Sequence, residues 1–195
     1  MTPFEHVTSR LVHLPDANID TDQIIPARFL KVTDRIGLGE HLFEDLRRDN
    51  NGAPRGEFPL NRPEARGAAI LLAGKNFGCG SSREHAAWAL HGAGFRVILS
   101  TSFADIFRGN ALTNGILPVS VTPDAYVSLA RLAAEKGELT VDLSRLTAEW
   151  SSGSFPFQLE PFARECLLKG VDPLGYILSH APAIKKYEAT RQGAL

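Results

Sequence analysis

A strand, a glycine-rich loop, a helix and a second strand follow one another in the middle of the chain, and this order constrains the fold most. Residues 68–73 and 95–100 are apolar runs of strand length. Between them lie a glycine-rich loop at 74–80 and a helical pattern at 82–91, which glycines end. We therefore expect a βαβ unit with parallel strands and a right-handed crossover.

The flanking sequence continues the alternation of strands and helices. Further strands are expected at 8–14 and 116–121, short antiparallel strands at 139–143, 148–150 and 155–159, and helices at 40–47, 103–112 and from Thr122-Pro123 to Gly137, with a loop at 18–26 and a long excursion at 48–67. Helices are expected to close the chain. The sequence predicts one α/β domain over residues 1–195, with a parallel central sheet, an antiparallel layer and a C-terminal helical extension from about 161.

Composition excludes several classes of function. The formal net charge of −1 gives no general attraction to phosphate backbones or to anionic lipid. The longest apolar runs are too short to cross a bilayer, and the N-terminus lacks the pattern of a signal peptide. Cys79 and Cys166 form no Cys-x-x-Cys pair, which fits a reduced cytoplasm. We expect a cytoplasmic protein that binds neither nucleic acid nor membrane, and no metal or cluster site on this chain alone.

The loop at 74–82 is the best candidate for chemistry. It joins the end of a parallel strand to the start of a helix, which is where open α/β sheets bind ligands. Glycines let a ligand approach the backbone, and the free N–H groups of a helix start favour anions. Arg83 adds a fork of donors that suits a carboxylate. The residues predict an anion site that contains the hydroxyls of Ser81 and Ser82.

This loop also admits other interpretations. A serine before a helix is commonly only an N-cap, and the residues by themselves leave the cap and the anion site both open. A nucleotide P-loop needs a lysine after its second glycine, and the run 78–81 has none. A nucleophile elbow needs Gly-x-Ser-x-Gly, whereas Arg83 and Glu84 follow the serines. A thiol pair of Cys79 with His85 stays open, although a lone loop cysteine is commonly a bystander.

The run Asn-Phe-Gly-Cys-Gly-Ser-Ser-Arg-Glu-His-Ala at 76–86 resembles the signature of the swivelling domain of the aconitase superfamily. Its cysteine-containing form is similar to that of the small subunits of bacterial 3-isopropylmalate dehydratases. Further stretches agree with this family in the same order, at 18–26, 102–107, 109–110 and 170–175. The resemblance covers nearly the whole chain and implies a three-layer β/β/α swivelling domain with a parallel central sheet and a smaller antiparallel sheet.

The resemblance implies a hydro-lyase whose active site is divided between two chains. Together they would isomerise 2-isopropylmalate to 3-isopropylmalate by dehydration and rehydration, in leucine biosynthesis. The large subunit would hold a [4Fe–4S] cluster on its own cysteines, and an open iron would act there as a Lewis acid. This chain would bind no cofactor, and its partners would be the large subunit and a small dicarboxylate substrate.

The same resemblance assigns roles to residues. Ser81 matches the general base that removes the carbon-bound proton, and Ser82 and Arg83 match residues that hold a substrate carboxylate. Asp22 matches an active-site acid, although aspartate is also common in turns. His85 is expected to pack or to hydrogen-bond at the helix rather than to transfer protons.

The segment 29–43 corresponds to the loop that distinguishes substrates within the family. The bacterial small subunits typically have Arg-Thr-Gly where this chain has Arg35-Ile36-Gly37. Arg35 suits a dicarboxylate, although an ordinary surface arginine explains it nearly as well. Ile36 leaves open a related hydro-lyase that acts on homoaconitate or a methylmalate. A third alternative is a small-molecule binding module without catalysis.

Overall fold

The predicted βαβ unit forms the centre of the sheet in the computed structural model, which describes residues 1–31 and 35–191. Strand β2 (Ile70–Ala73) and strand β3 (Val97–Ser100) are parallel, and helix α3 (Glu84–Gly92) connects them. Residues 32–34 of the predicted substrate loop lie outside the described residues.

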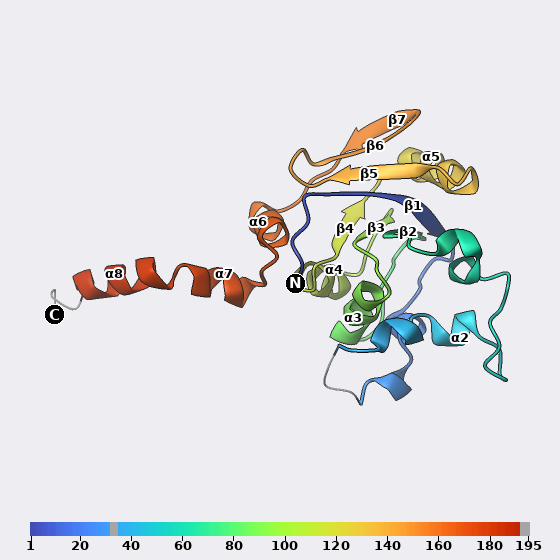
Figure 1. Cartoon of the computed structure of the whole chain (residues 1–195), viewed down its shortest axis with the longest axis horizontal. Coiled ribbons are helices and arrows are strands. Elements are labelled where there is room, and N and C mark those ends of the chain that lie inside the picture. The colour runs from blue at the N-terminus through green and yellow to red at the C-terminus, as the bar shows by residue number, and fades with distance from the viewer. Residues whose placement is uncertain (32–34, 192–195) are drawn as a thin grey trace.

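One seven-stranded mixed sheet runs through the molecule in the order β4-β3-β2-β1-β5-β6-β7. The remaining strands are β1 (His6–Leu14), β4 (Leu117–Ser120), β5 (Glu138–Asp142), β6 (Thr147–Trp150) and β7 (Gly153–Pro156). Strand β1 joins the two halves, because residues 6–10 pair antiparallel with β5 and residues 11–14 pair parallel with β2. The expected parallel sheet with a smaller antiparallel one is confirmed, and the two parts are continuous through β1 (Figure 1).

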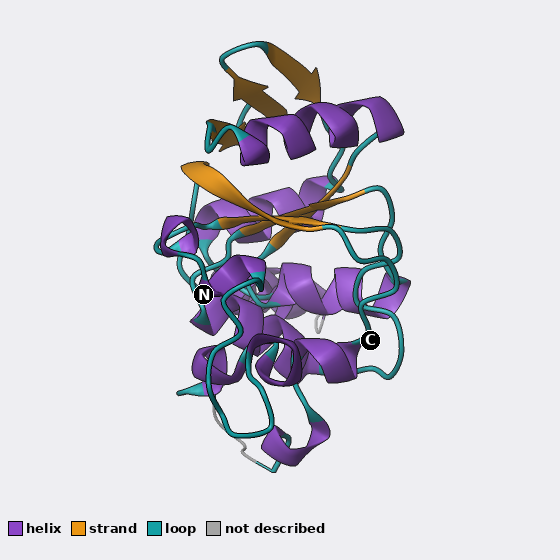
Figure 2. Cartoon of the chain, turned by 90° about the vertical axis from the view of Figure 1, so that its right-hand side faces the viewer, coloured by secondary structure: helices purple, strands orange, loops and turns teal. Residues whose placement is uncertain are grey.

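Alternate residues of the parallel strands face two separate cores. Leu71 and Ile98 pack with the buried alanines of α3 and with helix α4 (Asp105–Thr113). Leu72 and Leu99 face helix α5 (Pro123–Ala134) and the apolar side of β5 and β6. Figure 2 shows the strands between helices on both sides, with the antiparallel strands at the top. The layers follow from the period of two in a strand buried on both faces.

The prediction of one continuous helix at 40–47 is wrong. The structure has a 3-10 turn η2 (Leu38–His41) and a short helix α2 (Glu44–Arg47), separated by Leu42 and Phe43, and Phe43 has a left-handed conformation with φ of 53°. This backbone lets the Phe43 ring lie fully buried, 6.0 Å from the ring of Phe58. Burial of a large aromatic side chain therefore outweighs the continuation of a helix.

The loop expected at 18–26 contains a short helix, α1 (Thr21–Ile24). Asp20 accepts a hydrogen bond from the Gln23 backbone, and the Gln23 side chain accepts one from the Asp20 backbone, which is a capping box. A 3-10 turn η1 (Ala27–Phe29) follows, and the excursion at 48–67 contains two further turns, η3 (Pro59–Asn61) and η4 (Pro63–Ala65).

The chain closes with helices α6 (Pro161–Lys169), α7 (Pro173–Ser179) and α8 (Ala181–Arg191). Helix α6 ends at Gly170, which has a φ of 67° and lies against Pro3. Helices α7 and α8 extend away from the sheet (Figure 1) and leave Leu174 and Leu178 exposed. Within the described ranges, no helix has the length and apolar character needed to cross a membrane.

Candidate active site at the serine loop

The loop after β2 depends on glycine at position 78. Gly78 has a φ of 76°, and a Cβ atom there would lie 2.2 Å from Cγ of Phe107. A residue with a side chain would be strained in its backbone and would clash with a buried ring. Phe107 also meets Phe77 edge to face, with their ring centroids 5.2 Å apart. The stretch at 102–107 is therefore the support beneath the serine loop.

A second support comes from the segment that precedes α1. Backbone hydrogen bonds join the two segments from Asn18 N–H to the Lys75 carbonyl (2.8 Å), from Gly78 N–H to the Ile19 carbonyl (2.8 Å), and from Thr21 N–H to the Cys79 carbonyl (2.9 Å). The Thr21 hydroxyl, in a residue only 2% exposed, donates to the Ser81 carbonyl over 3.0 Å. These bonds place Asp22 beside the serines, although the two lie about sixty positions apart in sequence.

The two serines are exposed, and neither caps the helix. Helix α3 begins at Glu84, and its N-cap residue is Arg83, which makes no side-chain capping bond. Among the described residues, the hydroxyls of Ser81 and Ser82 have no hydrogen-bond partner. The interpretation of these serines as N-caps is therefore wrong, and both hydroxyls are available to a ligand.

Arg83 forms an ion pair with Asp22. Its Nη1 donates to Oδ1 of Asp22, and the Arg83 side chain is 17% exposed against 52% for Asp22. Asp22 lies in the first turn of α1, where a negative charge is also favoured by the helix dipole. The structure thus brings together Asp22, Ser81, Ser82 and Arg83, four of the five residues predicted for the site.

Arg35 is exposed and precedes η2 in the chain, and its side chain contacts α3 at a residue outside the serine loop. Its guanidinium carbon is 5.2 Å from the ring centroid of Trp88, which is one helical turn past Glu84. The pKa of His91 on the same helix is lowered, chiefly by burial and then by the charges of Arg96, the N-terminus and Arg35. Helix α3 therefore connects the two features: the serine loop leads into its start, and Arg35 contacts it at Trp88.

Cys79 and His85 each contact another residue in the described part of the chain. The Cys79 thiol donates to the Asn18 carbonyl over 3.3 Å, which adds to the bonds that hold the loop. The His85 ring packs on Trp88 with centroids 4.5 Å apart. The positions of Thr21 and Trp88 were not predicted from the sequence. The Asp-x-x-Gln pattern at 20–23 was a signal for α1, and hence for Thr21.

The residues of this chain do not fit an iron–sulfur cluster. The chain has two cysteines, Cys79 in the serine loop and Cys166, which is buried on α6. Such clusters are held by three or four clustered ligands. Across residues 1–31 and 35–191, no group of three or more ligating side chains could hold a metal ion.

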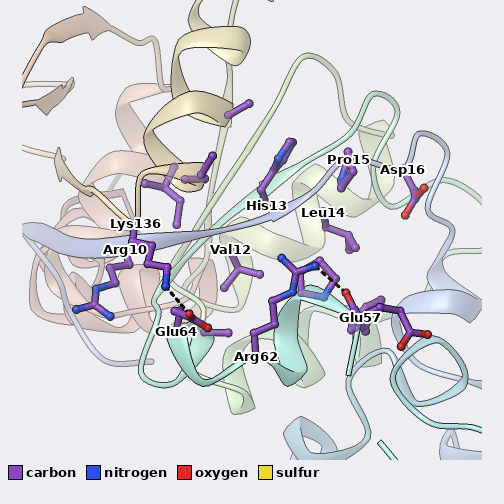
Figure 3. Close-up of a pocket in the computed structure, with 17 residues that line it drawn as sticks. Arg10, Val12, His13, Leu14, Pro15, Asp16, Glu57, Arg62, Glu64 and Lys136 are labelled. Atoms are coloured by element: carbon purple, nitrogen blue, oxygen red, sulfur yellow. Dashed lines mark hydrogen bonds and ion pairs between the residues drawn. The ribbon is translucent and has the colours of Figure 1, made fainter. Parts of the chain in front are cut away.

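A cavity of about 600 Å³ lies apart from the serine loop, between β1, the turns at 57–65 and the end of α5 (Figure 3). Three of its charged side chains are already bonded: Lys136 pairs with Glu64 at 2.5 Å, and Arg62 donates to the Glu57 carbonyl at 3.0 Å. Of the described residues, none from 74–83 lines it. The exposed serine surface and this cavity are separate features.

Comparison with known proteins identifies the family. The family model of the aconitase C-terminal domain matches residues 1–124. The 3-isopropylmalate dehydratase small subunit of Roseiflexus sp. (strain RS-1) is 52% identical over 98% of this chain and 95% of its own length. That of Anaeromyxobacter dehalogenans (strain 2CP-C) is 53% identical over 98% of this chain and 100% of its own.

A solved structure agrees with these relatives. The crystal structure of a 3-isopropylmalate dehydratase from Methanocaldococcus jannaschii DSM2661 superposes with a TM-score of 0.70 at 26% identity, and the match covers 93% of this chain and 99% of that one. Its fold confirms the expected swivelling domain. The chain belongs to the family of 3-isopropylmalate dehydratase small subunits, within the aconitase C-terminal domain family.

Proposed function

We propose that this chain supplies the proton-transferring half of a hydro-lyase active site that isomerises 2-isopropylmalate to 3-isopropylmalate in leucine biosynthesis. The observation that carries the proposal is the pair of exposed serine hydroxyls beside Arg83 at the start of α3. They lie on the loop that carries the family signature, and they are not used to build the fold. The second half of the site would come from a large subunit, and both chains would work in the cytoplasm.

Ser81 is the proposed base. Its Oγ would take the carbon-bound proton as the substrate is dehydrated, and would return a proton to the neighbouring carbon on rehydration. A serine hydroxyl is a very weak acid, so the alkoxide needs nearby positive charge and N–H donors. The Arg83 guanidinium and the backbone at the start of α3 are the groups available for this.

Arg83 and Ser82 are the proposed carboxylate ligands. A guanidinium has five N–H donors, and the bond to Asp22 uses one nitrogen, Nη1. The remaining donors can bind a substrate carboxylate while Asp22 fixes the orientation of the group. The second carboxylate of the substrate would be bound by Arg35, whose guanidinium lies over the ring of Trp88 on α3.

The cluster would belong to the large subunit, because this chain has too few cysteines to hold it. This arrangement accounts for a site that is open to solvent at Ser81 and Ser82. A partner surface would be needed to exclude water and to complete the anion site. We infer that the chain alone is inactive.

One observation favours a second candidate, a related hydro-lyase acting on homoaconitate or a methylmalate. Ile36 is 86% exposed beside Arg35, where an apolar side chain can affect which substrate tail is accepted. Comparison of kcat/KM for these acids and for isopropylmalate decides between the candidates. Absence of activity on isopropylmalate, with activity on one of the others, would select the second.

The decisive experiment is co-purification with the cluster-loaded large subunit, followed by an assay for the unsaturated intermediate. The proposal expects a stable complex that turns over isopropylmalate, and no turnover by either chain alone. Activity of this chain alone contradicts the divided site. A chain that forms no complex and instead binds phosphate or a nucleotide is a binding module, and the proposal is then wrong.

A further inference from the structure

The side chain of Arg35 contacts α3 at Trp88. Its guanidinium carbon lies 5.2 Å from the ring centroid of Trp88, within the range of a cation–π interaction. A guanidinium has five N–H donors around its edge, and a cation–π contact does not use them as hydrogen bonds. Arg35 can therefore bind a carboxylate while it remains over the Trp88 ring.

Trp88 is itself held in place. Its indole Nε1 donates to Oδ1 of Asn114 over 2.9 Å, and Asn114 is only 2% exposed. The Asn114 amide in turn donates to Oε1 of Glu84 over 3.0 Å and to the Asn110 carbonyl over 2.8 Å. Because both the oxygen and the nitrogen of the Asn114 amide are bonded, the plane of the indole ring is fixed by α3 and α4 together.

Residues 35–39 contact the same helix at a second place. A Cβ atom on Gly39, in η2, would lie 2.3 Å from the backbone carbon of Gly92 at the end of α3. The two backbones are thus in direct contact, which requires glycine at position 39. With Arg35 at Trp88 and Gly39 at Gly92, residues 35–39 are held along the second half of α3.

We propose that Trp88 is the positioning residue for Arg35, and that α3 sets the distance between Arg35 and the serine loop. Trp88 is four residues past Glu84, a rise of about 6 Å along the helix axis. The Trp88 ring thus orients the Arg35 guanidinium toward a substrate whose other end is bound at Ser82 and Arg83. This inference rests on the proposed function, because it takes Arg35 as a substrate ligand.

The kinetic test uses the complex with the large subunit and the variants Trp88→Leu and Trp88→Phe. A cation–π contact at an exposed site changes affinity by about two- to five-fold. Trp88→Leu should therefore raise KM by that factor and leave kcat within about two-fold, since the contact serves binding. Trp88→Phe keeps an aromatic face and should retain most of the wild-type KM. A fall in kcat by the same factor as the rise in KM would overturn the positioning role.

A double-mutant cycle with Arg35→Ala separates positioning from a general structural effect. If Trp88 acts through Arg35, Trp88→Leu should have no further effect on KM once Arg35 is absent. Multiplied effects in the double variant would mean that Trp88 acts independently of Arg35, and the inference would be wrong.

A spectroscopic test does not depend on the activity. The chain has two tryptophans, so Trp150→Phe leaves Trp88 as its only indole. In this background, Arg35→Ala should change the emission of the purified full chain, because water replaces a cation over the ring. Superimposable spectra would overturn the contact itself. Altered spectra together with a complex that is inactive on isopropylmalate would instead refute the proposed function and leave the contact supported.

Discussion

Arg83 and Asp22 form an ion pair that joins the start of α3 to the first turn of α1. The pair connects two segments that carry separate parts of the family pattern. Asp22 withdraws one donor of the guanidinium from solvent and fixes the direction of the remaining donors. The geometry therefore gives Asp22 a role in orientation, besides any direct contact with substrate.

Replacement of Asp22 by asparagine should reduce activity far more than stability. A pair with one partner half exposed contributes no more than about 1 kcal/mol to the free energy of unfolding. Without the carboxylate, Arg83 loses its fixed orientation, and we expect kcat/KM of the complex to fall at least about ten-fold. Steady-state kinetics and urea denaturation measure the two quantities. Glu64→Gln breaks an exposed pair outside the site and should leave kcat/KM unchanged. Equal effects of the two variants would refute the orienting role.

Ser81→Ala should leave a complex that assembles but turns over very slowly. Removal of a general base costs roughly 10²- to 10⁴-fold in kcat. The Ser81 hydroxyl makes no bond within the described part of the chain, so stability should be unaffected. Ser82→Ala is the matched control and should mainly raise KM, as expected for a carboxylate ligand. Normal turnover by Ser81→Ala would end its assignment as the base.

The strands could be predicted from the sequence because their signal is local. Apolar runs bounded by glycine placed β2 and β3 within two residues of their observed limits. The break at Phe43 could not be predicted in this way, because it depends on a contact with Phe58 across the long excursion. Local pattern determines where a strand lies, whereas tertiary burial determines where an irregular segment bends.

The candidate site residues were named by the family resemblance, and the structure shows which of them lie together. Four of these five residues lie on one loop and on α1, and the backbone and hydroxyl bonds from Thr21 bring these two segments together. No sequence spacing relates Arg35 to Trp88 or Trp88 to Asn114, because each contact joins different elements. The network behind Arg35 therefore required the structure.

His91 should make the chain less stable as the pH falls below 6.5. Burial, the largest cause, and the charge of Arg96 lower the pKa of His91 from its usual 6.5. The unfolded chain then binds a proton that the folded chain resists, so the free energy of unfolding decreases as pH falls through this range. His91→Gln cannot titrate and should show a shallower decline between about pH 6.5 and 5. Urea denaturation at several pH values measures this decline. If the free energy of unfolding of His91→Gln declines with pH as steeply as that of the wild type, the prediction is wrong. His13→Gln should also show a shallower decline, because burial lowers the pKa of His13 as well.

Gly78→Ala should destabilise the fold and remove activity together, because this position has both a left-handed backbone and no space. Gly52 is the matched control, with a φ of 81° against 76° and no atom within 4 Å of the place that a Cβ would take. Gly52→Ala should cost about 1–2 kcal/mol from the backbone alone. Gly78→Ala adds the clash with Phe107, which should cost a further 1–3 kcal/mol or so. Urea denaturation of both variants measures the difference. Equal losses would mean that the serine loop can move away from Phe107, and that its support by α4 is weaker than the geometry indicates.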